Sequence, residues 1–522
     1  MKTICTLKTM LARGLEHSPD SMAIVEGGRQ YTFREFADRT HRISNALLEL
    51  GLARGERVAV LSRNSAESAE LYFAIPNAGL VVVMLNFRLS LSEIVAVLTD
   101  AEAAVLIVSD EFAEHLEDIG RSCNLVRHRI CFGSQGDLVE GVIAYESLIE
   151  EAASEMPEVE VTEDDLAALM YTSGTTGVPK GCMASHRNLY HVGRSMALEL
   201  RMEPDDVGII PVPLFHVSGA DVLMNGMYSG CTSIIMPRWN VYEFIRLVQL
   251  HRVTTGLIVT PMLETLVNCP DCPPNKLTSL RKVIFAGAPV SAVVFSKAVQ
   301  RFGNIFIHGF GTTETLGSIS ILRTEQAVQE LGKGRREILA SCGKSYADMQ
   351  AEVVDDKGQR VAAGVVGEIR ARGLGVTQGY WRKECETRKA FRDGWYYTED
   401  LAKIDEQGFI YIVGRKRDMI ITGAENVFPA EVENILYKHP AVAQVAVIGV
   451  ADERWGESVT AIIVVKEGMR VSEDDIQTFC RGEIAGYKIP KQVVFTDELP
   501  TSATGKLMKG QLRAKISDRI VS

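Results

Sequence analysis

The feature that most constrains this chain is a regular alternation between short apolar runs and amphipathic helical patterns. Apolar residues recur at helical spacing between Phe33 and Leu50, which predicts a helix. We expect strands at 57–61, 81–85 and 104–108, with helices over 66–79 and 91–99. Strand–helix alternation of this kind predicts a parallel sheet that is covered by helices on both faces.

The same pattern returns in the middle of the chain. A helix is expected over 241–251, and strands are expected at 208–212, 233–236, 256–260, 283–286 and 305–308. The last two strands end in the glycine-rich turns Gly287-Ala288-Pro289 and Gly309-Phe310-Gly311-Thr312-Thr313-Glu314. Ligands of open α/β sheets bind at the carboxyl ends of the strands, so these turns indicate a binding site.

The pattern changes after about residue 345, where short strands and frequent turns predict a small, mostly antiparallel subdomain. Beyond a charged junction at 414–418, helices are expected over 429–438 and 473–484, with strands at 442–450 and 459–465. This last unit has the size of a domain. We therefore predict an N-terminal domain over 1–415, with its β-rich part at about 345–415, and a C-terminal domain over 416–522.

Composition excludes several classes of function. The net charge is −11 without a basic block, which argues against nucleic acid as a partner. Cys269 and Cys272 have no second pair to complete a zinc site, so we interpret them as part of a loop. The scattered cysteines suit reduced thiols in the cytoplasm. The uncharged run at 71–87 is short and interrupted, so no membrane span is expected; a buried helix end followed by a strand fits better.

The stretch 171–181 is dense in glycine and hydroxyl side chains and contains Lys180. Glycine lets backbone N–H groups approach a ligand closely, and hydroxyls and a lysine suit phosphate oxygens. We predict a polyphosphate-binding loop, with a polar turn as the alternative. It is not a Walker A loop, because Pro179 and Gly181 flank the lysine. Ser185 is expected to cap a helix over 186–200, so the loop joins two strands.

These motifs, in this order, resemble the adenylate-forming superfamily, and in particular its acyl-CoA synthetases, over residues of about 20–510. The matching stretches are 172–181, Pro213-Leu214-Phe215-His216, 287–289, 309–314, 395–400, Gly414-Arg415 and Thr504-Gly505-Lys506. The resemblance implies an α/β fold. Its large N-terminal domain would hold two stacked, mostly parallel sheets and a small β-barrel-like subdomain, followed by a small mobile α+β C-terminal domain.

The resemblance also implies the reaction of an ATP-dependent acid–CoA ligase. A carboxylate is a poor acyl donor, but attack on the α-phosphate of ATP gives an acyl-adenylate whose leaving group is AMP. A thiol then displaces AMP and forms the acyl-CoA thioester. Such an enzyme uses ATP, Mg²⁺, coenzyme A and a small carboxylic acid, and a homodimer is compatible with it. The alternatives are an adenylate former that serves a carrier-protein thiol or another acceptor, and a nucleotide-binding regulator without activity.

The resemblance assigns roles residue by residue. Lys506, Lys180, Glu314 and His216 would be catalytic, and Glu314 and Thr176 would hold the metal. Nucleotide and phosphate contacts would come from Thr172, Ser173, Gly174, Thr175, Thr176, Gly177, Lys180, Gly287, Ala288, Pro289, Gly309, Phe310, Gly311, Thr312, Thr313, Asp400 and Arg415. Gly423, Trp455 and Tyr487 would contact coenzyme A, and Arg417 would be the hinge of the C-terminal domain. Phe310, Glu399 and Ala424 depart from the family's usual tyrosine and two glycines.

The acid would bind in a pocket of small and mostly apolar residues. Its predicted members are His216, Val217, Ser218, Thr260, Ala286, His308, Gly309, Leu316 and Gly317. His216 is either a gate or a packing residue, and His308 either contacts a polar substituent or hydrogen-bonds the backbone. These residue types leave fatty, aryl and short functionalised acids open.

Overall fold

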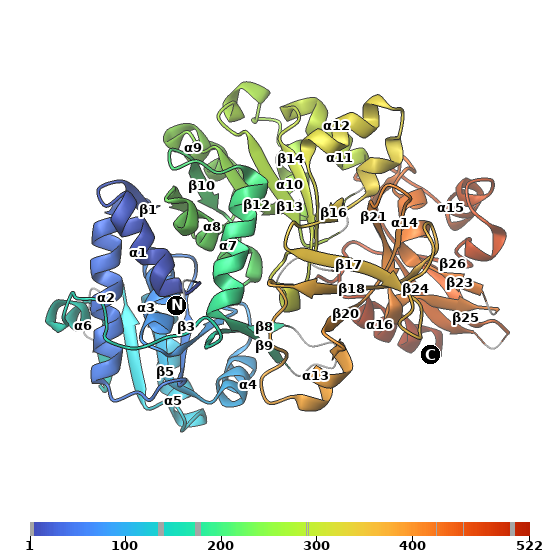
Figure 1. Cartoon of the computed structure of the whole chain (residues 1–522). Coiled ribbons are helices and arrows are strands. Elements are labelled where there is room, and N and C mark those ends of the chain that lie inside the picture. The colour runs from blue at the N-terminus through green and yellow to red at the C-terminus, as the bar shows by residue number, and fades with distance from the viewer. Residues whose placement is uncertain are drawn as a thin grey trace.

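The computed structural model describes residues 5–133, 140–172, 179–288, 290, 292–423, 425–452, 454–501 and 507–521. The described residues form four β-sheets with helices around them (Figure 1). Two large sheets make up the N-terminal part, a smaller sheet follows, and the last sheet lies at the C-terminal end of the molecule. This arrangement confirms the α/β fold expected from the sequence.

The first large sheet has the strand order β7-β6-β5-β3-β4-β8-β9, and all its neighbours are parallel except β8 and β9. Its strands and helices confirm the alternation predicted over 30–110. They are α2 (Phe33–Glu49), β3 (Arg57–Leu61), α3 (Ala66–Asn77), β4 (Val81–Leu85), α4 (Leu91–Ala101), β5 (Ala103–Ser109), α5 (Leu116–Ser122), β6 (His128–Phe132), β7 (Val142–Ala144), α6 (Tyr145–Glu151), β8 (Leu166–Thr172) and β9 (Lys180–Ser185).

The second large sheet has the order β16-β15-β14-β13-β12-β10-β11-β1-β2, with a parallel centre from β14 to β1. Its elements are α1 (Leu7–His17), β1 (Met22–Glu26), β2 (Arg29–Thr32), α7 (His186–Leu200), β10 (Val207–Ile210), α8 (Val217–Ser229), β11 (Thr232–Ile235), α9 (Val241–His251), β12 (Thr255–Val259), α10 (Thr260–Asn268), β13 (Lys282–Ala286), α11 (Ala292–Phe302), β14 (Phe306–Phe310), β15 (Ser320–Leu322), α12 (Thr324–Gly332) and β16 (Lys344–Ser345).

Helices α3 and α8 form the interior between the two large sheets. Every residue of α3 is buried, and α8 is buried from Val217 to Met227. α3 packs on β4 and β8 of one sheet, whereas α8 packs on β10 and β12 of the other. A helix that is buried on all sides belongs to the core of a large domain, which explains the uncharged run at 71–87. Among the described residues, no helix is both long and apolar enough to cross a membrane.

The β-rich part and the C-terminal part follow as expected. The antiparallel sheet contains β17 (Met349–Val354), β18 (Gly367–Gly373), β19 (Phe391–Arg392), β20 (Trp395–Ile404) and β21 (Ile410–Arg415), with α13 (Glu384–Ala390) beside it. The C-terminal part contains β22 (Ile420–Thr422), β23 (Glu425–Val427), α14 (Pro429–Leu436), β24 (Val442–Asp452), β25 (Gly456–Val465), α15 (Glu473–Cys480), β26 (Gln492–Phe495) and α16 (Lys509–Val521). The helix predicted over 473–484 is shorter, because it ends at Cys480 just before Gly482, whose φ is +91°.

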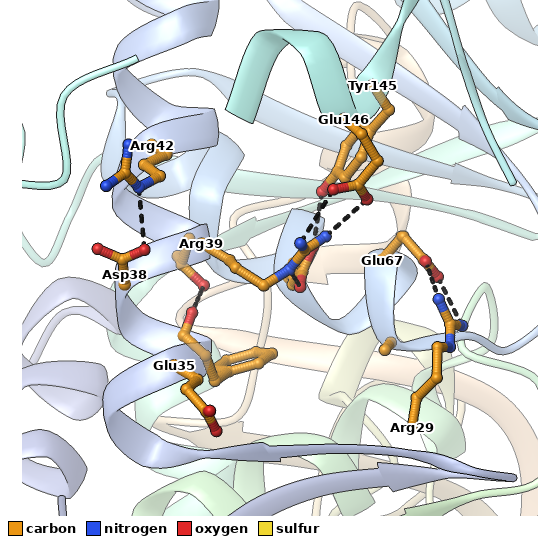
Figure 2. Close-up of polar contacts among 12 residues, drawn as sticks. Arg29, Glu35, Asp38, Arg39, Arg42, Glu67, Tyr145 and Glu146 are labelled. Carbon is orange, nitrogen blue, oxygen red and sulfur yellow. Dashed lines mark hydrogen bonds and ion pairs between the residues drawn. The ribbon is translucent and has the colours of Figure 1, made fainter. Parts of the chain in front are cut away.

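A buried ionic network joins α2, α3 and α6 (Figure 2). Glu70 of α3 has a fully buried side chain and pairs with Arg39 of α2. Tyr145 of α6 donates a 2.9 Å hydrogen bond to Glu70, and the Arg39 guanidinium also contacts Glu146 at 2.9 Å. Burial raises the pKa of Glu70 to about 7, although the Arg39 charge opposes that rise. Buried charges of this kind are tolerated only when they are paired.

Candidate functional site

The predicted phosphate loop lies between β8 and β9, which pair as an antiparallel hairpin with Thr172 opposite Lys180. The structure therefore confirms that the loop joins two strands. Ser185 ends β9 and caps α7 by accepting a hydrogen bond from the Asn188 backbone, as expected. Ser173, Gly174, Thr175, Thr176 and Gly177 lie outside the described residues.

Lys180 and Glu314 approach each other through Tyr380. The Lys180 ammonium lies 5.2 Å from the centre of the Tyr380 ring, and the Tyr380 hydroxyl donates a 2.7 Å hydrogen bond to Glu314. The ring is held in place because residues 378–381 pair with β9: Gln378 N–H donates to Met183, and Trp381 N–H donates to Gly181. Burial, followed by the charge of Glu314, raises the Tyr380 pKa, so its hydroxyl remains a donor.

The Tyr380 contact was not predicted from the sequence. Gly379-Tyr380-Trp381 lies more than sixty positions from Glu314 and was not among the motifs that carried the resemblance. Its only local signal is an aromatic pair after a glycine. That pattern is also common in packing positions, so the pairing with β9 was needed to identify it.

Asp400 and Arg415 form a second charged pair at neighbouring positions of β20 and β21. The Arg415 Nε lies 3.0 Å from the Asp400 Oδ1, and the aspartate side chain is only 7% exposed. Burial alone would lower the Arg415 pKa, but the Asp400 charge raises it above its ordinary value. Arg415 is thus charged, and the pair lies where a ribose contact was predicted.

Glu399, next to Asp400, has a left-handed backbone with φ of +61° and an exposed side chain. Its N–H donates to Glu368 at 3.1 Å. A positive φ favours glycine because a Cβ is strained there, which gives a physical reason for the family's usual glycine at this position. Glu399 is exposed, and Asp400 stays paired with Arg415.

The two glycine-rich turns follow β13 and β14, as predicted. Gly287 has φ of +90°, and the Ala288 carbonyl accepts a 2.8 Å hydrogen bond from Thr260. A Cβ on Gly311 would lie 2.1 Å from the Gly317 backbone, so only glycine fits that position. The turn that carries Thr312, Thr313 and Glu314 is therefore packed directly against Leu316 and Gly317. Pro289 lies outside the described residues.

The predicted acid pocket is divided between two faces of the nine-stranded sheet. Ala286 and Gly309 lie together, since a Cβ on Gly309 would be 3.7 Å from that of Ala286. His308 belongs to the other face, because side chains alternate along a strand and His308 stacks on Phe285 at 4.7 Å. Its Nδ1 is 2.9 Å from the Ser341 carbonyl, which is the backbone contact considered above. Burial lowers the His308 pKa to about 4.

His216 precedes α8 and caps it. Its Nδ1 accepts a 3.3 Å hydrogen bond from the Ser218 N–H and lies 2.8 Å from the Ser218 hydroxyl. Val217 and Ser218 follow in the first turn of this buried helix. The structure therefore brings His216 to the end of α8 beside Val217, and the capping contact holds its imidazole.

The predicted coenzyme A residues lie in the C-terminal part. Gly423 has φ of +59°, and its N–H donates to the Trp455 carbonyl at 2.8 Å. Trp455 and Tyr487 are about two-fifths exposed, and the Lys491 ammonium lies 4.0 Å from the centre of the Trp455 ring. Arg417 lies just after β21, in the turn Lys416–Asp418. Ala424 and Lys506 lie outside the described residues.

A Gly423→Val variant is expected to slow thioester formation at least about tenfold while adenylation proceeds normally. A Cβ at Gly423 would lie 2.8 Å from the Trp455 ring, so the ring or the loop must shift. Single-turnover transfer from preformed acyl-adenylate to coenzyme A measures the effect. Gly468→Val is the matched control, because Gly468 has φ of +77° in the same part of the chain but has open space around it. Equal losses in both variants would contradict the role of Gly423.

Paired charges, a lysine and a carboxylate that both contact one tyrosine, and glycine turns at the carboxyl edge of a sheet suit a metal-complexed nucleotide. The class that this fold and these groups define is that of nucleotide-dependent, adenylate-forming enzymes. The chain matches the family model of AMP-binding enzymes over residues 11–381 and the model of their C-terminal domain over 431–506. It belongs to this family, and within it the chain is an AMP-forming acid–CoA ligase that uses ATP and coenzyme A.

Relatives align over nearly the whole length. A feruloyl-CoA synthase of an Amycolatopsis species is 35% identical over 95% of this chain and 96% of its own. A 2-succinylbenzoate–CoA ligase of Listeria monocytogenes is 32% identical over 97% of this chain and 99% of its own. Among solved structures, ATP-bound MatB from Rhodopseudomonas palustris superposes on this chain with a TM-score of 0.90. The two sequences are 30% identical, and the superposition covers 99% of each chain.

Proposed function

We propose that this ligase activates an aromatic carboxylic acid. The observation that carries the proposal is that Ala286 and Gly309 lie side by side on one face of the nine-stranded sheet and present no bulky side chain. Small residues side by side on a sheet leave a flat slot, and a flat slot suits a planar ring. The similarity to a feruloyl-CoA synthase supports the same class of acid.

The proposal includes a division of roles among the charged residues. Lys180 binds the phosphates of ATP, and Asp400 accepts hydrogen bonds from the ribose hydroxyls, with Arg415 beside it. Lys506 neutralises the attacking carboxylate and the α-phosphate. In such a reaction an anionic nucleophile meets a polyanion, so cations and oriented donors must stabilise the transition state.

Mg²⁺ is proposed to bind at Glu314, with Thr176 as the second protein ligand. Glu314 offers carboxylate oxygens, the ligand type that Mg²⁺ prefers, and Tyr380 orients that carboxylate. Among the described residues, no group of three His, Cys, Asp or Glu side chains forms a metal cluster. That agrees with an ion held by one carboxylate together with substrate phosphates, and the bound ion would neutralise phosphate charge.

The test is a pyrophosphate-release screen of hydroxycinnamates, benzoates and straight-chain fatty acids, each with and without coenzyme A and with EDTA as a further arm. Turnover with aromatic acids, formation of a CoA thioester and loss of activity with EDTA are expected. Turnover with straight-chain fatty acids alone would overturn the aromatic assignment. Activity unchanged by EDTA would overturn the metal assignment.

Location in the cytoplasm and assembly as a homodimer stay predictions. Light scattering of the purified protein measures the oligomeric state.

Asp400→Asn is expected to raise the KM for ATP by about 10- to 100-fold, since a hydrogen bond to a charged acceptor contributes about 1.5–3 kcal/mol. The decisive comparison uses 2′-deoxy-ATP and 3′-deoxy-ATP. The unchanged enzyme should bind either deoxy analogue more weakly than ATP. The Asp400→Asn variant should bind ATP and the two analogues with nearly equal affinity. A variant that still discriminates fully between ATP and its deoxy analogues would contradict the ribose contact.

A further inference from the structure

Asp100 is a carboxylate that none of the predicted motifs contains, and it joins distant parts of the chain. It lies in the last turn of α4, where the helix dipole disfavours an acidic side chain. Its Oδ2 accepts a 2.7 Å hydrogen bond from the Tyr171 hydroxyl, and its Oδ1 accepts a 2.9 Å hydrogen bond from the Lys383 ammonium. Its backbone carbonyl accepts a third, of 3.1 Å, from the Trp381 indole N–H. These donors are 71, 283 and 281 positions away, so all three contacts are tertiary.

Both carboxylate oxygens of Asp100 are engaged in a partly buried place. The Asp100 side chain is 22% exposed and that of Lys383 is 18% exposed, so water screens this pair less than an open surface pair. Burial, followed by the hydrogen bond to Asp100, raises the pKa of the Tyr171 hydroxyl, which therefore stays protonated and donates. Because both partners are donors, a side chain with two acceptor oxygens is needed to satisfy them. An asparagine would turn its amide NH₂ toward one of the two donors.

The first anchored residue, Tyr171, belongs to β8, which leads into the predicted phosphate loop. Tyr171 stands opposite Gly181 of β9 in the hairpin. A Cβ on Gly181 would lie 3.0 Å from the Cζ of Tyr171, so the tyrosine ring lies directly over that glycine. Lys180, the residue before Gly181, is the first residue of β9. Asp100 therefore holds the ring that packs on the strand carrying this lysine.

The second anchored segment follows Tyr380, the residue that contacts both Lys180 and Glu314. Trp381, next to Tyr380, donates its backbone N–H to the Gly181 carbonyl at 2.8 Å, so this segment lies along β9. Figure 1 shows α4 and α13 beside the β8–β9 hairpin, where these parts of the chain meet. Movement of the segment would displace the Tyr380 hydroxyl, which lies 2.7 Å from Glu314.

The backbone just after Trp381 is held in an unfavourable conformation. Arg382 has φ of +52°, a left-handed conformation that is strained for a residue with a side chain. Asp100 binds the residue on each side of it, Trp381 through its carbonyl and Lys383 through its carboxylate. Glu102 also pairs with Arg382, but its side chain is more exposed, at 41%. Asp100 is thus the partly buried anchor of this segment, and Glu102 is an exposed one.

We propose that Asp100 is a positioning residue for adenylation. By anchoring both segments, it fixes Tyr380 relative to β9 and so sets the spacing of Lys180 and Glu314. This inference rests on the phosphate and metal roles proposed for Lys180 and Glu314, and it adds the group that holds them in register. Groups that stabilise a transition state must be preorganised, so a small displacement lowers the rate strongly.

The test measures the two half-reactions separately, with the acid that gives the highest turnover. Asp100→Asn should slow single-turnover formation of acyl-adenylate by about tenfold, since a hydrogen bond to a charged group is lost. It should also raise the Mg²⁺ concentration needed for half of the maximal rate, because Tyr380 no longer orients Glu314. Transfer of preformed acyl-adenylate to coenzyme A should stay within about twofold, since pyrophosphate has left before that step.

Variants of the two partners probe the same contacts without changing Asp100. Tyr171→Phe removes one donor but keeps the ring over Gly181, so we expect a smaller loss of adenylation, of about threefold. Lys383→Met removes the other donor and should slow adenylation by about tenfold. Combining Asp100→Asn with Tyr171→Phe should cost clearly less than the product of the two single losses, because both changes break one contact. Full multiplication of the losses would contradict a shared contact.

Glu102→Gln is the matched control, because it removes the exposed pairs with Arg382 and Arg57 at the same end of α4. It should keep adenylation within about twofold. The melting temperature of each variant should lie within about 4 °C of that of the unchanged enzyme. If Asp100→Asn melts below this range, Tyr171→Phe and Lys383→Met decide by the same criteria.

Three results would overturn the inference: an unchanged rate of adenylation in Asp100→Asn, equal losses in both half-reactions, or a loss of the same size in Glu102→Gln. Glu314→Gln distinguishes this failure from a failure of the proposed roles. If Glu314→Gln impairs adenylation and Asp100→Asn does not, the inference alone fails. If Glu314→Gln leaves adenylation unchanged, the proposed role of Glu314 fails and the inference fails with it.

Discussion

Glu314→Gln is expected to lower kcat/KM for adenylation by about 10²- to 10³-fold, the size seen when one preorganised electrostatic contact to a transition state is removed. Glutamine keeps the volume and can still accept from Tyr380 at 2.7 Å, so the turn after β14 should stay folded. What it loses is the negative charge that would hold a divalent cation. The defect should therefore appear as a higher Mg²⁺ requirement together with a lower rate.

Two further variants sharpen this test. Tyr380→Phe removes the hydroxyl but leaves the ring beside Lys180, so we expect a smaller loss of about tenfold, corresponding to one hydrogen bond to a charged group. Glu325→Gln changes an exposed carboxylate on α12 and should have no effect. Acyl-adenylate formation in a single turnover, measured across a Mg²⁺ titration, distinguishes the three. Glu314→Gln with an unchanged Mg²⁺ dependence would contradict the metal assignment.

Arg39→Met is expected to destabilise the N-terminal part by about 3–5 kcal/mol, because it leaves a buried carboxylate without its cation. Glu70 has no exposure, and among the described residues Tyr145 would remain as its hydrogen-bond partner. Arg34 is also on α2, and Arg34→Met, which breaks its exposed pair with Asp20, should cost less than about 1 kcal/mol. The midpoint of urea unfolding measures both, and the double variant Arg39→Met, Glu70→Leu should recover most of the loss.

The loss of folding stability in Arg39→Met should depend on pH, and the direction follows from the Glu70 pKa. The folded pKa of Glu70, about 7, lies above its ordinary value of 4.5, so between these values the folded protein binds more protons than the unfolded chain. Stability from Glu70 is therefore present at low pH and is lost as the pH rises through about 7. The Arg39→Met penalty should be larger at about pH 8 than at about pH 5. A penalty independent of pH would contradict an unpaired Glu70 carboxylate.

The sequence predicted the elements of the fold well because their signals are local. β3, β4 and α9 have the bounds that the apolar patterns indicated, and Ser185 caps α7 as its residue type suggests. Helix ends were less accurate, as α15 shows, because a single glycine decides where the helix stops.

The candidate site was predicted only where a motif carries its residues. Glu314, Asp400 and Lys180 stand in recognisable motifs, and the structure brings charged or aromatic partners to each of them. Tyr380 was missed, because its significance depends on a contact between distant parts of the chain. The face of the sheet on which His308 lies likewise follows from strand register, which residue type alone does not give.

The two large sheets separate two tasks in a way that matters for how such enzymes diversify. Lys180 belongs to a strand of the seven-stranded sheet, whereas α8 packs on strands of the nine-stranded one. Under the proposed roles, exchanging side chains along α8 would alter which acid is accepted without disturbing the hairpin that is proposed to bind phosphate. A single activation chemistry can then serve many metabolites by substitutions confined to one helix, and the same helix is the natural target for redesign.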